Sequence, residues 1–363
     1  MRFDLDEQQR AFQTAVAEYL EAECPMERAL AAHEEVDGNA DGGVPADLGI
    51  WQGLMQLGIG GMIVPEEHGG LGLGLLDMAV VAEPIGRYAA PGPFVEHALA
   101  TLALVIAGND EQRAMWLPAL ASGEKRATVA LAEDKGDWSA DRWTLDGATL
   151  TGTKHYVLHA EGADLIVVGL AGGALGLVCG DAKGLSISAV PSTDAGKRLS
   201  TLTFVDVAVE VLPVVAGARL VDAGAILLAA DAFGGASACV DRAVSYAKER
   251  EQFGQPIGAF QAIKHQLADM ALAVVPTVGL YWYAAHAFDT RDFIAASEAA
   301  SLAKSHLGEL YPPIARRMIE AHGGIGYTWE YGDHVWLKRA LFDQNYLGSP
   351  RQHRLRVAEL AGW

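Results

Sequence analysis

The sequence contains little cysteine: Cys24, Cys179 and Cys239 are widely spaced among 363 residues. They form no Cys-x-x-Cys pair and have no histidine pair beside them, so we expect neither a structural zinc site nor another metal centre. An odd number of distant thiols is typical of reduced, mostly buried cysteines. We therefore expect a cytoplasmic protein.

Basic residues are also scarce, because 27 lysines and arginines stand against 46 aspartates and glutamates, a formal net charge of −19. A nucleic-acid-binding protein needs a basic face to neutralise phosphates, and a protein held on an anionic membrane needs a polybasic surface. Both classes are excluded. The uncharged stretch over residues 165–180 is rich in glycine and shorter than the ~20 residues of a spanning helix, so we expect no membrane insertion.

Apolar residues make up 51% of the chain and charged residues 20%, a composition that favours a globular protein with a large core. The local patterns predict a helical segment over residues 1–125, a small β-domain over 126–218 and a second helical segment over 219–363. An Asp146-Gly147 turn predicts a β-hairpin between strands at residues 143–145 and 149–151.

Within residues 258–274, apolar side chains recur every three or four positions, which predicts a helix packed in a bundle. They are Phe260, Ile263, Leu267, Met270 and Val274. The glycine-rich run over residues 70–74 resembles a dinucleotide-binding fingerprint, but that fingerprint requires a preceding strand. Because helical patterns flank this run, we interpret it as a loop between helices.

The most informative stretch reads REQFGQPIGAFQ over residues 250–261, where one helix ends, a glycine- and proline-containing turn follows, and a second helix begins. One interpretation is a plain helix–turn–helix, with Arg250 placed favourably at a helix C-terminus. The other is a ligand site, because a cation, an amide and an aromatic ring on one exposed turn suit a phosphate and a flat ring.

This stretch resembles the signature of the FAD-dependent acyl-CoA dehydrogenases. Two further runs resemble the same family: VPEEHGGLG over residues 64–72 and HGGIGYTWE over residues 322–330. The resemblance covers essentially the whole chain. It implies an α+β multidomain fold with an N-terminal helical domain, a central β-domain and a C-terminal four-helix bundle.

The resemblance also implies roles for individual residues. Arg250, Gln252 and Phe253 are expected to reach across a subunit interface to FAD bound mainly by another protomer, and Gln261 is expected to contact the same FAD. The adjacent Gly323 and Gly324 are expected to let the backbone approach the cofactor closely. Tyr156 falls where relatives place an aromatic side chain beside the flavin ring, although it also suits the core of the β-domain.

The implied reaction oxidises an acyl-CoA thioester to the trans-2-enoyl thioester, with a carboxylate removing the α-proton and hydride passing to flavin N5. Many relatives carry this carboxylate at the position of Leu347, which cannot accept a proton. Others, often acting on steroid side chains, carry a glutamate on the helix that precedes the 250–261 turn. There this chain has Asp231, which is therefore the candidate base, with a structural carboxylate at a helix N-terminus as the alternative.

The resemblance leaves three functions open. The chain is an acyl-CoA dehydrogenase that passes electrons to an electron-transfer flavoprotein, a non-catalytic interface subunit of a heteromeric dehydrogenase, or a flavin oxidase or monooxygenase. The expected assembly is a homo-oligomer or a heterotetramer with a related subunit. The similarity to steroid-type relatives favours a bulky or branched acyl group.

Overall fold

The computed structural model describes residues 4–34, 46–133 and 136–363. The first part is helical, and side chains such as Asp6 and Asn109 cap helices by accepting a backbone N–H three residues ahead. The helices are α1 (Glu7–Glu23), α2 (Met26–Glu34), α3 (Ala46–Gln56), α4 (Leu75–Arg87), α5 (Phe94–Ala107) and α6 (Asp110–Ala121). Residues 70–74 form the loop that leads into α4, as predicted.

The middle part consists of strands in two small sheets. The strands are β1 (Ala127–Ala130), β2 (Thr149–Leu158), β3 (Leu165–Gly169), β4 (Leu175–Cys179), β5 (Leu185–Val190), β6 (Leu199–Ala208) and β7 (Glu210–Val211). One sheet has the order β1-β3-β4-β7 and the other has the order β2-β6-β5. A separate apolar cluster, which includes Leu150, Ile166 and Phe204, fills the space between them.

The hairpin predicted over residues 143–151 is wrong. Residues 143–146 are not a strand, and β2 pairs with the distant β6 instead. The reason is a side chain: the backbone N–H groups of Thr144 and Leu145 donate to the carboxylate of Glu133, at 2.8 Å and 3.3 Å. A carboxylate therefore takes the hydrogen bonds that a partner strand would have accepted.

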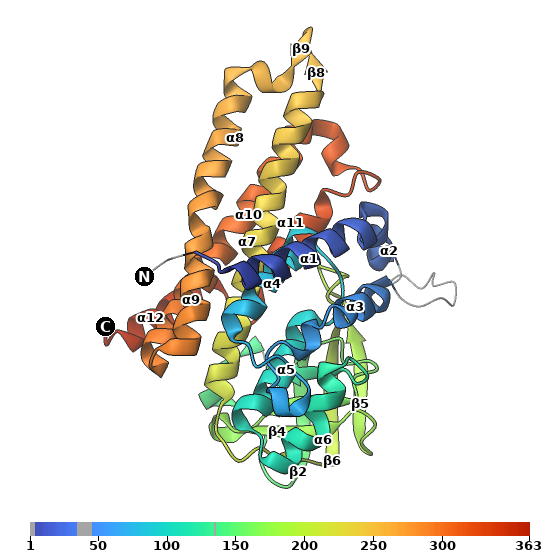
Figure 1. Cartoon of the computed structure of the whole chain (residues 1–363), viewed down its shortest axis with the longest axis vertical. Coiled ribbons are helices and arrows are strands. Elements are labelled where there is room, and N and C mark those ends of the chain that lie inside the picture. Colours follow the sequence, from blue (N-terminus) through green and yellow to red (C-terminus); the bar gives the residue numbers. More distant parts are fainter. Residues whose placement is uncertain (1–3, 35–45, 134–135) are drawn as a thin grey trace.

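The last part is helical again and includes the two longest helices. Its elements are α7 (Gly217–Glu249), the hairpin strands β8 (Glu251–Gln252) and β9 (Gln255–Pro256), α8 (Gln261–Val274), α9 (Val278–Thr290), α10 (Phe293–His322), α11 (His334–Asn345) and α12 (Pro350–Leu360). Figure 1 shows α7, α8 and α10 side by side, with the β8–β9 hairpin at one tip of the molecule and the sheets at the other end. The order helical, β, helical confirms the predicted fold class, while the exact domain boundaries stay a prediction.

Helix α7 is the buried axis of the molecule, and glycines let its neighbours approach closely. A Cβ on Gly234 would lie 1.9 Å from the carbonyl oxygen of Glu83 on α4, and a Cβ on Gly86 would lie 2.0 Å from the carbonyl oxygen of Asp231. Both distances are impossible for a real side chain. The crossing of α4 and α7 therefore requires glycine at these two positions.

Two helical stretches are long and apolar enough to cross a membrane, residues 217–249 and 261–290. The first is α7, whose apolar window is 94% buried, so its composition is explained by its place in the core. The second covers α8 and α9 and its window is only 33% buried, with Leu272 and Val275 largely exposed. The expectation of no membrane insertion stays a prediction.

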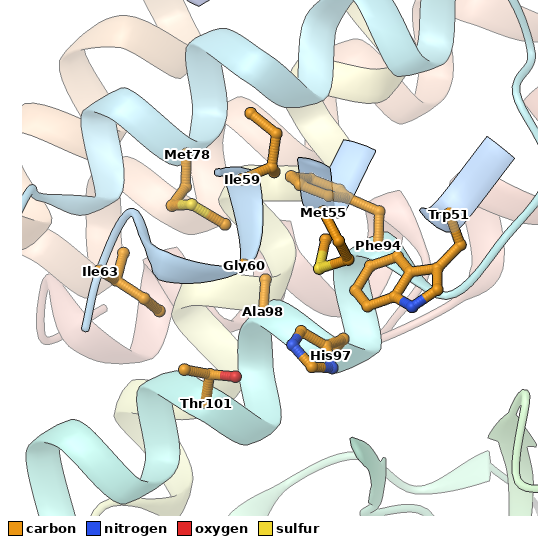
Figure 2. A pocket seen from close by; sticks show the side chains of 10 residues that line it. All are labelled: Trp51, Met55, Ile59, Gly60, Ile63, Met78, Phe94, His97, Ala98 and Thr101. Atoms are coloured by element: carbon orange, nitrogen blue, oxygen red, sulfur yellow. The ribbon is translucent and has the colours of Figure 1, made fainter. Parts of the chain in front are cut away.

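His97 on α5 joins that helix to the end of α6 and to β1. Figure 2 shows it beneath a pocket lined by Trp51, Met55 and Phe94. Its Nδ1 accepts the backbone N–H of Ala127 in β1 at 3.3 Å, so the neutral ring keeps its proton on Nε2, which lies 3.2 Å from the carbonyl oxygen of Leu120. Burial lowers the pKa of His97 to about 4.

This lowered pKa predicts a loss of stability in acid. The contribution of neutral His97 is complete above pH ~6.5, the ordinary pKa of histidine, and is lost as the pH falls through about 4. Between pH 7 and pH 4, urea denaturation should show a free energy of unfolding that falls about 2–3 kcal/mol further in the natural chain than in a His97→Gln variant. Parallel pH profiles for the two proteins would contradict this account.

Candidate functional site

The turn that follows α7 presents the residues of the 250–261 motif to solvent. Arg250 caps α7, and its carbonyl oxygen accepts the N–H of Ile257 at 2.7 Å, which closes the β8–β9 hairpin. Phe253 and Gly254 form the tip with φ angles of +53° and +77°. The Phe253 ring is 93% exposed and its only described ring contact is edge-on to Phe260, at 6.1 Å between centroids.

The remaining residues expected to bind the cofactor at this end are also open. Gln252 and Gln261 are exposed, the latter as the first residue of α8. Gly323 ends α10 with a φ of +65°, which favours glycine, and an added Cβ on either Gly323 or Gly324 would meet nothing within 4 Å. An open backbone of this kind leaves room for a ligand to lie directly against it.

Aromatic contacts bring the Gly323 segment to the base of the hairpin. The rings of Tyr246, one turn before Arg250, and His322, just before Gly323, lie 4.3 Å apart. Asp333 is fully buried beside them and accepts hydrogen bonds from Arg242 at 2.7 Å and 3.0 Å. The ends of α7 and α10 are thereby locked together, so the motifs at residues 250–261 and 322–330 form one surface.

Tyr156 does not belong to this surface. It lies near the end of β2, in the part of the chain that forms the two sheets, where β2 has an irregular register and Tyr156 adopts a φ of +55°. Its side chain is 39% exposed, so it does not fill the core of the β-domain. The chain therefore offers two separate sets of candidate cofactor contacts, one at the hairpin and one at the β-domain.

Asp231 lies in the middle of α7 and is completely buried. Nη1 of Arg339 donates to its two carboxylate oxygens at 3.2 Å and 3.4 Å, and Nε of the same guanidinium bonds Asp194. Burial raises the pKa of the neighbouring Asp343, and the Asp231 carboxylate raises it further. Because these contacts already engage its oxygens, the geometry favours a structural ion pair, and the catalytic role of Asp231 stays a prediction.

Leu347 occupies a buried position of unusual backbone geometry, with a φ of +57°. Its side chain packs onto α7 at Gly224, where an added Cβ would lie only 2.3 Å from Leu347 Cδ1 and 3.1 Å from a methyl carbon of Leu99. The place where many relatives carry their base is thus filled by leucine side chains. Within the described residues, no group of three or more His, Cys, Asp or Glu side chains is arranged to hold a metal ion.

Sequence reasoning missed two features of these sites. Arg339, the partner of Asp231, lies 108 residues away, and no local pattern connects the two. The second is the contact of Trp138 with Tyr346, at 4.8 Å between ring centroids. The signal in the sequence was a bulky indole beside Gly136 and Asp137, where a loop ordinarily has polar residues. It indicates that Trp138 packs against another part of the chain.

Comparisons with known proteins identify the family. Residues 6–124 match the acyl-CoA dehydrogenase N-terminal domain and residues 215–361 match the C-terminal domain of the same family. The acyl-CoA dehydrogenase IpdE2 of Mycobacterium tuberculosis is 33% identical over 318 residues, 87% of each chain, and its counterpart from Mycolicibacterium smegmatis is 30% identical over 359 residues, 97% of this chain and 98% of the other. The chain therefore belongs to the acyl-CoA dehydrogenase family and to that class of enzymes.

Solved structures show the same fold over nearly the whole chain. A variant of the Tcur3481–Tcur3483 steroid ACAD is 32% identical with a TM-score of 0.89, and the match covers 98% of both chains. PigA with FAD shares the fold at 20% identity, with a TM-score of 0.86 over all of this chain and 99% of the other. Membership of the acyl-CoA dehydrogenase family confirms the expectation of FAD as cofactor.

The ion pair of Asp231 predicts a stability defect that an exposed pair on the same helix does not share. Asp231→Asn leaves the buried Arg339 charge less compensated and should lower the free energy of unfolding by roughly 3 kcal/mol. The control is Asp241→Asn, because Asp241 forms an exposed pair with Arg87 at 2.7 Å and should cost at most about 1 kcal/mol. Equal urea midpoints for the two variants would contradict the structural role.

Proposed function

We propose that the chain works in the FAD-dependent oxidation of an acyl-CoA thioester to the trans-2-enoyl thioester, within an assembly of more than one chain. The observation that carries this proposal is the exposed hairpin, which presents Arg250, Gln252 and Phe253 at the tip of the molecule. An aromatic ring left 93% exposed gains little from its own chain, so its apolar surface is available to a ligand or a partner.

The hairpin surface fits one half of FAD. The Arg250 guanidinium would pair with the diphosphate, and the faces of Phe253 are free to stack on the adenine. The Gln252 and Gln261 amides supply hydrogen bonds, and the open backbone at Gly323 and Gly324 lets the ligand lie close. When bound, FAD supplies the acceptor for the hydride that leaves the acyl β-carbon.

For proton transfer, this chain lacks a free carboxylate at the position where many relatives carry the base. Removal of the α-proton needs a carboxylate in an apolar, water-poor place, and Leu347 and Leu99 provide such a place without the carboxylate. Asp231 is the proposed base of this chain, and to reach a substrate it would have to leave Arg339. In the complete assembly, Asp231→Asn therefore separates two roles: turnover lost at unchanged affinity for the substrate supports the base, and undiminished turnover excludes it.

A second function is favoured by the same geometry. With leucine at one base position and an ion-paired aspartate at the other, the chain suits an interface subunit that completes the site of a related chain. The steroid ACAD of similar structure is named for two components, Tcur3481 and Tcur3483. The largely exposed apolar side chains of Leu272 on α8 and Val275 just after it supply surface for such a partner. We propose a bulky, steroid-like or branched acyl group as substrate and an electron-transfer flavoprotein as acceptor.

The cofactor assignment predicts the effect of Arg250→Ala. Removing the guanidinium takes away a charge-assisted contact to the diphosphate, so the assembled enzyme should retain FAD about tenfold more weakly. Absorbance of flavin released by dialysis measures this directly, and Lys248→Ala, an exposed cation in the last turn of α7, is the matched control.

Unchanged retention in Arg250→Ala would refute the assignment of the hairpin to FAD. Rapid oxygen consumption with an acyl-CoA and no other electron acceptor would instead indicate a flavin oxidase. Reduction of an added electron-transfer flavoprotein without oxygen uptake is the expected result.

A further inference from the structure

Trp138 joins the β-domain to the C-terminal helices through an aromatic cluster. Its indole lies edge-on to Tyr346, just after α11, with 4.8 Å between centroids, and 6.3 Å from the ring of Tyr156 on β2. Phe342 stacks on the other side of Tyr346 at 5.0 Å. The indole is 9% exposed although it stands in a loop, so it is packed rather than lying on the surface.

The loop that carries Trp138 is held at both ends. The Glu133 carboxylate accepts the N–H and hydroxyl of Thr144 at 2.8 Å and 2.7 Å, and it bonds the buried Lys154 ammonium at 2.8 Å. Within the loop, Asp137 accepts the N–H of Ser139 at 3.1 Å and pairs with Arg142 at 3.2 Å. These bonds hold the described residues around Trp138, among them Asp137, Ser139 and Thr144, in place.

The backbone beside Trp138 also covers Tyr156. Gly136 has a φ of +69°, and a Cβ added there would lie 3.4 Å from Cε2 of Tyr156 and 3.8 Å from Nε1 of Trp138. Any side chain at position 136 would therefore touch the tyrosine ring that would flank a bound flavin, so the loop backbone lies close beside that ring. Tyr346, whose ring the indole also contacts, immediately precedes Leu347, the position at which many relatives carry the base.

We propose that Trp138 occupies the place of the flavin ring in this chain's own cofactor position, so that the FAD served by the chain is held by a partner and touched only through the hairpin. A three-ring flavin is larger than an indole, and the place beside Tyr156 and Tyr346 that the packed indole takes cannot hold both. The inference rests on the second of the proposed functions, the interface subunit, and adds to it: this chain is the half of a pair that lends residues to a flavin without holding the ring.

The test uses lumiflavin, the flavin ring without its ribityl and adenosine parts, as a probe of the ring position. Binding to the natural chain purified alone, followed by quenching of lumiflavin fluorescence, should be at least tenfold weaker than binding to Trp138→Gly. Binding of ADP, which probes the hairpin end, should be equal in both proteins. Trp363→Phe removes a 94% exposed indole and is the control, with no expected gain.

Two results would overturn the proposal: equally tight lumiflavin binding by the natural chain and Trp138→Gly, or one FAD held per natural chain purified alone. The FAD count of the natural chain tests the proposal even where the glycine variant fails to fold. In that case Trp138→Phe, with a smaller ring, is the milder variant, and its lumiflavin affinity should lie between those of the natural chain and of a chain without the indole. The proposed function fails by a different route, through unchanged FAD retention in Arg250→Ala. The two failures are therefore distinguishable.

Discussion

The arrangement of the sites depends on one buried cation. Arg339 on α11 is fully buried, and its guanidinium bonds Asp194 between β5 and β6, Asp231 on α7, and the carbonyl oxygens of Ala89 and Ala90 between α4 and α5. One side chain therefore ties all three parts of the chain together. A buried guanidinium is tolerated only when its N–H groups have acceptors. Helix α11, helix α7 and the α4–α5 and β5–β6 connections must therefore keep their relative positions.

This constraint sets the surroundings of Tyr346 and Leu347. Helix α11 ends at Asn345, so the position of Arg339 also places Tyr346 and Leu347, which follow directly. Tyr346 then meets Trp138, and Leu347 packs at Gly224. Holding α11 in place thus fixes a closed, aromatic and apolar region at the junction of the domains. The hairpin at the tip of the molecule, with Arg250 and Phe253, stays exposed.

The fold and the exposed turn over residues 250–261 could be predicted from the sequence, because their signals are local. Helical periodicity, the strand-rich middle and the 250–261 turn each depend on residues close together in the chain. The features that local patterns do not reveal depend on distant partners. The Asp146-Gly147 hairpin is absent because Glu133 captures the N–H of Thr144, and Asp231 has an ion-paired environment because Arg339 folds back onto it from 108 residues away. Nothing near either residue in the sequence indicates those contacts.

The central claim is that this chain contributes to a flavin site shared between subunits while its own ring position is closed. Native mass spectrometry of the chain, alone and co-expressed with a related dehydrogenase subunit, tests this most directly by counting FAD. We expect the chain alone to carry no FAD and the mixed assembly to carry one FAD for each pair of chains. A homo-oligomer with one FAD per chain would contradict the account.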